Sequence, residues 1–457
     1  MESDTFTSDL IVDPPETAWD LIRISPERAD AIPLLWEADV AVVGGGSAGC
    51  AAAVMSARHG AATVLIESGS FFGGTAVAVL DTMYGFFPPG SQERVVGGVG
   101  WEVAEAMLNR GQAMLRANTY GAGTGVTYEP EALKLEWDRR IIGSGVRPLL
   151  HARMGAVILD GSTVRGVVVL TRRGPFRIAA QRVVDASGDA DVAWAAGCSL
   201  EVPSARRRVQ PLTTTFRLGG VGEPPATAEL HRLMHEAADS GEYVLPRLEG
   251  SAHRTVIPGI FHTNVTRVSG LDPTNPWAAT AAEIEGRSQA AEYVRFFKDR
   301  VPGYEQSYLL NTSAWAGTRE TRRLIGEYVL TKDDVLQARQ FDDAIALCGA
   351  PIEDHDASRS TIWRYVAAGD GGEPSGRTYG IPFRSLVPQV IDGLLVAGRC
   401  LSATHDAHAS ARSIGQCLAY GHAAGVAAAL SVETGCSQRD VDTHTLRSRL
   451  SADGVIL

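Results

Sequence analysis

The stretch Asp39-Val40-Ala41-Val42-Val43-Gly44-Gly45-Gly46-Ser47-Ala48-Gly49 decides how this chain begins to fold. Its first five residues are an apolar, β-branched run that is typical of a buried parallel strand. The glycines after it fit a tight turn, and the alanine-rich segment 47–59, followed by Gly60, predicts a helix. A second apolar run, residues 63–67, predicts the next strand. The pattern therefore predicts a β-α-β unit with a glycine-rich turn at the start of its helix.

The glycine spacing in that turn is G-x-G-x-x-G, and each glycine has a physical task. Gly44 permits the turn, Gly46 lets a diphosphate approach the backbone, and Gly49 lets the helix pack closely on the strand. The free N–H groups at the helix start and the helix dipole both favour the negative charge of a diphosphate. Glu67, at the end of the second strand, can accept hydrogen bonds from the ribose hydroxyls of an adenosine. We therefore expect a dinucleotide at this turn, with NAD and FAD as the two alternatives.

Three further segments favour FAD. The small-residue loop 72–75 can pass close beside a long cofactor, and residues 184–189 and 395–399 each end an apolar strand with small residues. An extended FAD needs such distant contacts, whereas a classical NAD domain does not. The residues expected to contact the cofactor are Gly44, Gly46, Ser47, Ala48, Gly49, Glu67, Ser68, Gly73, Gly74, Thr75, Met154, Ala186, Ser187, Gly188, Gly398, Arg399, Arg412, Ile414 and Gly415.

Composition excludes several other classes of protein. The chain has 457 residues and a formal net charge of −11, which argues against nucleic acid as the main partner. The short basic run Arg206, Arg207 and Arg208 is interpreted as a solvated loop. No two of the six cysteines form C-x-x-C, and no run is apolar and long enough to span a membrane, so we expect a cytoplasmic protein. The acidic N-terminal segment does not resemble a secretory signal.

The order of predicted elements indicates an α/β protein with a doubly wound parallel sheet and an inserted α+β domain. Helices are expected over 101–110 and 129–144, and five strands between 146 and 186 form a meander that returns to a parallel strand. Helices are also expected over 276–300 and 332–347, strands over 213–218 and 259–265, and a final strand and helix over 394–397 and 413–433. The predicted divisions are an N-terminal extension, 1–36, a cofactor-binding domain, 37–202 and 391–457, and an inserted substrate domain, 203–390.

Several stretches of this sequence carry a resemblance to a known family. They are residues 185–191 (Asp-Ala-Ser-Gly-Asp-Ala-Asp), 316–327, 381–388, 395–405 (Leu-Val-Ala-Gly-Arg-Cys-Leu-Ser-Ala-Thr-His), 407–412 and 423–425. From about residue 38 onward the chain is similar to the glutathione-reductase-like FAD superfamily, and within it to the oxidoreductases grouped with fumarate-reductase-type flavoproteins. Ala409 stands where that family usually has glycine, and 414–417 lacks a common proline. The resemblance implies non-covalent FAD, a doubly wound sheet and a substrate domain over the flavin face.

Candidates for the chemistry cluster near the predicted final helix. His405 and His408 suit proton transfer at neutral pH, although either is equally explained as a loop histidine. Arg412 can place positive charge near the flavin, hold a substrate carboxylate, or form a structural salt bridge. His262 can face the flavin, although a core histidine is the simpler interpretation. A metal site at these histidines is disfavoured, so no metal is expected.

Two charged clusters lie outside that region. If 319–323 is helical, Arg319, Arg322 and Arg323 share one face; an ion-pair network explains Arg323, and Arg319 and Arg384 are candidates for anchoring an anion. The polar segment 353–356 is expected to be exposed to solvent.

We expect a dehydrogenase or oxidase that takes a hydride from a small polar substrate. The alternatives are reduction of an activated C=C bond and an FAD-holding electron-transfer subunit. A second G-x-G-x-x-G is absent, which disfavours an NAD(P)H site in the chain, and the halogenase pattern W-x-W-x-I-P is absent as well. The partner expected is a small-molecule substrate, with no nucleic acid and no membrane; a homo-oligomer is left open.

Overall fold

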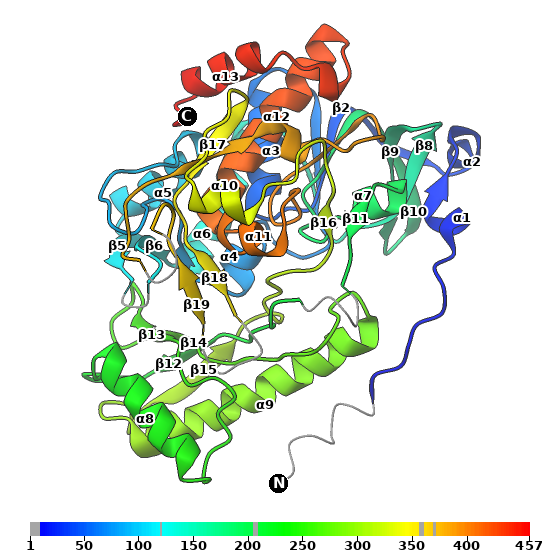
Figure 1. The fold of residues 1–457 in the computed structure, drawn as a ribbon. Coiled ribbons are helices and arrows are strands. Elements are labelled where there is room, and N and C mark those ends of the chain that lie inside the picture. The colour runs from blue at the N-terminus through cyan, green and yellow to red at the C-terminus, as the bar shows by residue number, and fades with distance from the viewer. Residues whose placement is uncertain (1–9, 119–120, 204–208, 356–360, 369–371) are drawn as a thin grey trace.

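The computed structural model describes residues 10–118, 121–203, 209–355, 361–368 and 372–457 (Figure 1). The run Arg206, Arg207 and Arg208 and the last residue of the polar segment, Asp356, lie outside the described residues.

Eight strands form the main sheet: β1 (Arg23–Ile24), β2 (Leu34–Val43), β3 (Thr63–Ile66), β7 (Arg147–Leu149), β8 (Arg153–Asp160), β9 (Thr163–Thr171), β10 (Gly174–Asp185) and β21 (Leu394–Val396). Their order is β1-β8-β9-β10-β2-β3-β7, and β21 pairs with β10. The strands β21, β10, β2, β3 and β7 run parallel, whereas β8, β9 and β10 form an antiparallel meander. The α/β class with a parallel sheet is therefore confirmed.

Two sequence expectations change in this sheet. The strands predicted over 176–179 and 182–186 are one strand, β10, which pairs with β9 in its first half and with β21 in its last residues. The predicted N-terminal extension also contributes to the sheet, because β1 pairs with β8 and β2 already begins at Leu34. The prolines of that segment limit its two helices, α1 (Trp19–Ile22) and α2 (Pro26–Asp30), to about one turn.

The central helix pair consists of α3 (Ser47–Arg58) and α12 (Ile414–Thr434), which lie side by side (Figure 1). A Cβ at Gly421 would overlap the carbonyl oxygen of Ala48, so α12 approaches α3 at backbone distance. A Cβ at Gly425, one turn further along α12, would likewise overlap the carbonyl oxygen of Ala52. Further helices of this region are α4 (Thr75–Ala78), α5 (Gly98–Asn109), α6 (Pro130–Gly143), α7 (Asp191–Ala196), α11 (His405–Ala411), α13 (Thr443–Ala452), η2 (Phe383–Leu386) and η3 (Gln438–Asp440).

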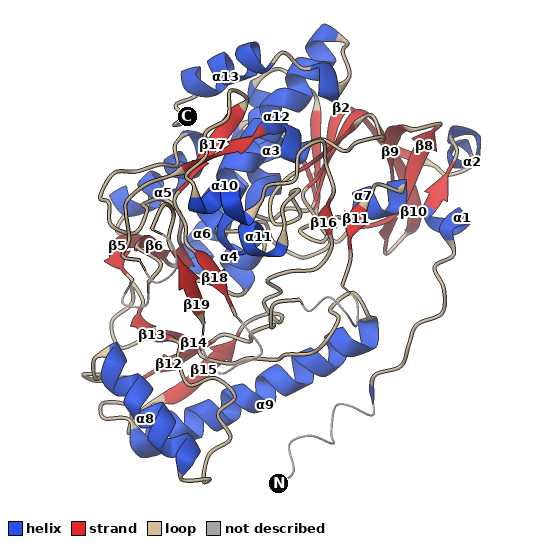
Figure 2. Cartoon of the chain, in the orientation of Figure 1, coloured by secondary structure: helices blue, strands red, loops and turns tan. Residues whose placement is uncertain are grey.

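A second sheet lies on the far side of the molecule from α13 (Figure 2). Its strands are β13 (Ser251–Arg254), β14 (Phe261–Asn264), β12 (Phe216–Gly219) and β15 (Tyr308–Thr312), in that order. Phe216, Leu218 and Phe261 point from one face into an apolar core shared with α8 (Thr227–Asp239) and α9 (Pro276–Arg300). Because side chains alternate along a strand, His262 and its neighbours two residues away point to the opposite face.

One predicted helix is wrong. Residues 332–347 form a short helix, α10 (Lys332–Leu336), and then a strand, β17 (Ala344–Cys348), which pairs with β20 (Tyr379–Pro382). Thr331 and Asp334 form a capping box that starts the helix, and Ala338 adopts a positive φ of 52° just after it. The chain therefore turns where the composition alone predicted a continuing helix.

Short strand pairs complete the described structure. They are β4 (Thr82–Met83) and β5 (Ala113–Ala117) on either side of β6 (Thr124–Tyr128), β11 (Leu200–Glu201) with β16 (Arg323–Leu324), and β18 (Ile352–Asp354) with β19 (Ile362–Arg364). Among the described residues, no helix combines the length and the apolar character needed to cross a membrane.

Candidate functional site

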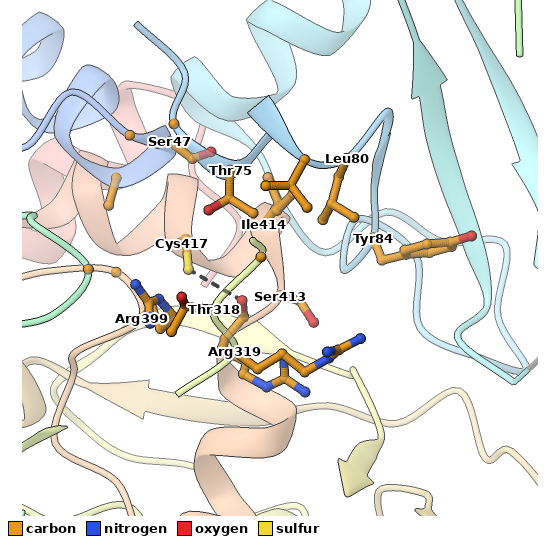
Figure 3. A pocket seen from close by; sticks show the side chains of 18 of the residues that line it. Ser47, Thr75, Leu80, Tyr84, Thr318, Arg319, Arg399, Ser413, Ile414 and Cys417 are labelled. Carbon is orange, nitrogen blue, oxygen red and sulfur yellow. Dashed lines mark hydrogen bonds between the residues drawn. The ribbon is translucent and has the colours of Figure 1, made fainter. Parts of the chain in front are cut away.

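A cavity of about 610 Å³ lies between the glycine-rich turn before α3, the start of α12 and the second sheet. The carboxyl ends of β2, β10 and β21 open into it, which is where ligands bind in open α/β sheets. Figure 3 shows Ser47 and Thr75 on one side of the cavity and Thr318, Arg319 and Arg399 on the other. The cavity therefore lies between the main sheet and the second sheet.

The glycines of the turn differ in what surrounds them. A Cβ at Gly44 would overlap the backbone of Ala186, and one at Gly49 would overlap the carbonyl oxygen of Gly44. Both residues therefore allow close packing of the protein on itself. A Cβ at Gly46 would instead point into open space, with its nearest heavy atom, Cα of Gly74, at 4.0 Å. Gly46 lines the cavity, so its missing side chain leaves room for a ligand rather than for a neighbouring segment.

The carboxylate of Glu67 is held in place by backbone amides. Its Oε2 accepts a hydrogen bond from N–H of Gly45 at 2.7 Å, and Oε1 accepts one from N–H of Gly69 at 2.6 Å. Oε1 also accepts from Oγ of Ser68 at 3.1 Å, whereas Oε2 keeps a second lone pair, and Glu67 lines the cavity. The residue can therefore accept further hydrogen bonds from a ligand's hydroxyl groups.

The two remote segments meet at the cavity. Arg399 donates to Oδ1 of Asp189 at 2.8 Å, which joins the loop after β21 to the loop after β10. Ser413 and Ile414, at the start of α12, line the cavity, whereas Gly415 bonds to the carbonyl oxygen of Tyr84. Most of the expected cofactor contacts therefore line one cavity: Gly44, Gly46, Ser47, Ala48, Glu67, Ser68, Gly74, Thr75, Met154, Ala186, Ser187, Gly188, Gly398, Arg399, Arg412 and Ile414. Gly49, Gly73 and Gly415 do not line it.

The two predicted histidines near α12, His405 and His408, lie outside the cavity. His405 forms ion pairs with Glu320 at 2.8 Å and Asp354 at 3.4 Å, and hydrogen bonds to Asp354 and Glu320 raise its pKa to about 9. His408 is fully buried and contacts the carbonyl oxygen of Arg399 at 2.7 Å, and burial lowers its pKa well below the usual value. Neither side chain lines the cavity.

Of the three candidate arginines, two line the cavity and one lies outside it. Arg319 and Arg412 line the cavity, but Arg384 pairs with Asp343 at 3.0 Å beside a separate surface depression. Residues 319–323 are not helical, so the condition under which these arginines would share a helix face is not met. Arg323 is buried and pairs with Glu201 at 2.5 Å and Glu320 at 3.0 Å, as the ion-pair interpretation expected. Arg322 pairs with Asp191 at 2.6 Å.

The candidate His262 lies on the cavity wall in a histidine–aspartate group, of which sequence reasoning missed the other two members, His253 and Asp81. His253 on β13 stands opposite His262 on β14, with their ring centroids 5.3 Å apart. Nε2 of His253 lies 2.9 Å from Oδ1 of Asp81, and Nδ1 of His262 lies 3.9 Å from Oδ2. All three residues line the cavity. No strand was predicted over 251–254, so nothing marked His253 as the cross-strand partner of His262.

Burial and neighbouring charges shift the pKa values of His262 and Asp81. Burial lowers the pKa of His262 to about 3, so its imidazole is neutral at physiological pH. Burial opposes the ionisation of Asp81, but the neighbouring His262, His253 and Arg217 outweigh it and hold the pKa of this carboxyl well below its usual value. A carboxylate can only accept, so Nε2 of His253 donates to Oδ1 of Asp81, and Nδ1 of His253 has no hydrogen-bond partner in the described residues.

The prediction that the polar segment 353–356 is exposed to solvent needs correction for its described residues. His355 is buried, with Nε2 3.1 Å from Oε1 of Glu353, and both residues line the cavity. Burial opposes ionisation of Glu353, but His355, Arg412 and Arg319 outweigh it and lower its pKa to about 2. Burial, with Arg319 nearby, lowers the pKa of His355 to about 3. The polar composition of this segment serves the cavity rather than bulk solvent.

Comparisons with known proteins give one match in sequence and several in fold. The profile of a family described as FAD dependent oxidoreductase matches residues 39–450. A geranylgeranyl bacteriochlorophyll reductase-like protein from Thermoplasma acidophilum is 12% identical, with 90% of this chain and 82% of that one covered and a TM-score of 0.49. The flavin-dependent brominase Bmp2 is 12% identical, with 91% and 84% covered and a TM-score of 0.49. The p-nitrophenol 4-monooxygenase PnpA from Pseudomonas putida DLL-E4 is 12% identical, with 91% and 84% covered and a TM-score of 0.45.

The cavity fits FAD. Its wall runs from the amide-held carboxylate of Glu67, past the open space at Gly46, to the loops after β10 and β21 and on to Ile414. The backbone N–H groups at the start of α3 would hold the diphosphate, and small residues on three segments leave room for the rest of an extended molecule. The cofactor of this protein is FAD.

Proposed function

This chain belongs to the FAD dependent oxidoreductase family, and we propose that the enzyme takes a hydride from a small polar organic substrate. FAD, when bound, supplies the hydride acceptor. A closer relation to fumarate-reductase-type flavoproteins and a cytoplasmic location are part of the same proposal. Six free cysteines, four of them buried, support the cytoplasmic location, because a reducing compartment keeps cysteines as free thiols.

The pairing of His253 with Asp81 carries this proposal. Oxidation of an alcohol or amine releases a proton as well as a hydride, so the site needs a proton acceptor. Nδ1 of His253 is buried and without a partner in the described residues, and Asp81 fixes the tautomer that leaves it basic. As the hydride leaves the substrate carbon, the hydroxyl or amine proton passes to this nitrogen and a carbonyl or imine remains. His262, neutral and beside it, can orient the same substrate group.

A test follows from the visible absorbance of the FAD-loaded protein. Anaerobic addition of hydroxy and amino compounds should bleach the flavin band, and recovery in air would mark an oxidase. His253→Gln and Asp81→Asn should retain FAD and slow bleaching by roughly 10²–10⁴-fold, the usual contribution of a general base. His235→Gln, on the exposed surface of α8, is the matched control and should bleach at the wild-type rate.

Two outcomes would contradict the proposal. Wild-type bleaching rates in His253→Gln would remove this residue from the chemistry. A flavin that no donor bleaches, but that an enoate reoxidises after dithionite reduction, would favour reduction of an activated C=C bond. The arginines of the cavity give that second function some support, because positive charge stabilises an enolate.

A further inference from the structure

Three arginines from distant segments line the cavity beside the second sheet: Arg247, Arg319 and Arg412. Arg319 donates one hydrogen bond, from Nη1 to the carbonyl oxygen of Pro211 at 2.6 Å. Arg412 donates from Nη2 to Oε1 of Gln210 at 2.7 Å and to the carbonyl oxygen of Glu353 at 3.4 Å. All of these acceptors are neutral, so the negative charge that acts on both Arg319 and Arg412 comes from a carboxylate to which neither is hydrogen-bonded, that of Glu353.

Arg319 and Arg412 differ in this respect from other arginines at and near the cavity. Arg399 and Arg322 each have a carboxylate oxygen within 2.8 Å. Within the described part of the chain, neither Arg319 nor Arg412 forms an ion pair with a carboxylate. A guanidinium has five N–H donors, so most of those on Arg319 remain available to the cavity that it lines.

The nearby carboxylates already have other partners. Glu353 accepts from His355, while Glu320 and Asp354 both pair with His405. Burial lowers the pKa of Arg319 well below its usual value, and the positive charges of Arg247 and Arg412 lower it further, whereas the charge of Glu353 raises it. Arg319 and Arg412, in a poorly solvated wall, therefore line space that a bound anion would stabilise.

The arginines adjoin the histidine group through β14. Asn264 and His262 are two residues apart on this strand and both line the cavity. Nη1 of Arg247 donates to the carbonyl oxygen of Asn264 at 3.2 Å. Arg247 therefore adjoins the strand that carries His262, and Arg319 and Arg412 line the same cavity as the histidines.

We infer that Arg319 and Arg412 bind a carboxylate of the substrate, which makes the substrate class small organic acids that carry a hydroxyl or amino group. The assignment of this anion as the substrate rests on the proposed function. A guanidinium presents two parallel N–H groups to a carboxylate, which a neutral amide of the same shape cannot match.

The test measures binding rather than turnover. The FAD-loaded enzyme is titrated calorimetrically with acetate, succinate and benzoate, and with acetamide, succinamide and benzamide. At least one acid should bind roughly tenfold or more tightly than its amide. In FAD-loaded protein, Arg319→Gln and Arg412→Gln should each weaken binding of that acid by roughly 10- to 100-fold, and the FAD content of Arg319→Gln, read from visible absorbance, should not change.

Two more variants separate a local effect from a folding defect. Arg384→Gln removes an arginine that lies outside the cavity, so it should bind the acid as the wild type does. Arg319→Lys keeps the charge without the planar fork and should give intermediate affinity. Equal affinity for acid and amide, no binding of any acid to FAD-loaded enzyme, or wild-type affinity in both glutamine variants would overturn the inference. Acid binding without bleaching by any donor would leave the carboxylate site standing and refute the proposed function.

Discussion

Gly46→Val separates cofactor binding from folding more cleanly than any other change in the glycine-rich turn. Gly46 has φ −74° and ψ −171°, an extended conformation that valine adopts readily. Its Cβ would have no heavy atom of the protein nearer than 4.0 Å, so the apoprotein should lose no more than about 0.5 kcal/mol, as for a surface substitution. The side chain would instead occupy the cavity where the diphosphate approaches the helix.

The expected loss of affinity follows from the hydrogen bonds that the diphosphate would forfeit. A hydrogen bond to a charged group contributes about 1.5–3 kcal/mol, so losing two at the start of α3 costs about 3–6 kcal/mol. That corresponds to a roughly 10²- to 10⁴-fold higher Kd for FAD.

The assay combines the flavin-to-protein absorbance ratio, a titration of apoprotein with FAD, and urea unfolding of the apoprotein. Gly143→Val is the matched control, because a Cβ there also meets open space, but on the exposed end of α6. A Gly46→Val protein that retains full FAD would refute the reasoning. So would apoprotein unfolding at much lower urea, since the defect would then lie in the fold.

The remaining predictions concern stability, pH and charge. Gly421→Ala should destabilise the protein by about 1–3 kcal/mol in urea, because its methyl group meets the backbone of α3; unchanged stability would disprove the close approach. The folded pKa of His405, about 9, lies above the ordinary histidine value of 6.5, so the stabilising contribution of His405 is full below pH 6.5 and is lost as pH rises through 9. Melting temperature should therefore fall across that range, and His405→Gln should flatten the fall while keeping turnover. Glu353→Gln should tighten binding of carboxylate probes in calorimetry, since it removes a competing negative charge; weaker binding would contradict this.

Elements with local signals were predicted closely from the sequence. The long helix α9 has the predicted bounds, 276–300, because Asn275 caps it, with its side chain accepting from N–H of Trp277 and Ala278, and Pro276 follows at the first turn. The helix predicted over 332–347 failed for the opposite reason. Its second half is held as a strand by pairing with β20, which lies about 35 residues further along the chain, and no nearby residue marks that pairing.

The same distinction explains the two halves of the candidate site. The cofactor side depends on backbone shape, and a backbone that must turn, pack or leave space requires glycine at fixed spacing, as Gly44, Gly46 and Gly49 illustrate. The other side depends on side chains brought together by sheet pairing: His253 meets Asp81 across 172 residues of sequence. Isolated histidines, arginines and glutamates in loops resemble solvated polar residues, which is why Glu353 and His355 were expected on the surface. Because no spacing rule ties the arginines and histidines to the glycine motif, relatives can keep the motif and exchange these side chains. Substrate preference in such proteins should therefore follow the positions of Arg319, Arg412 and His253, not the sequence of the turn.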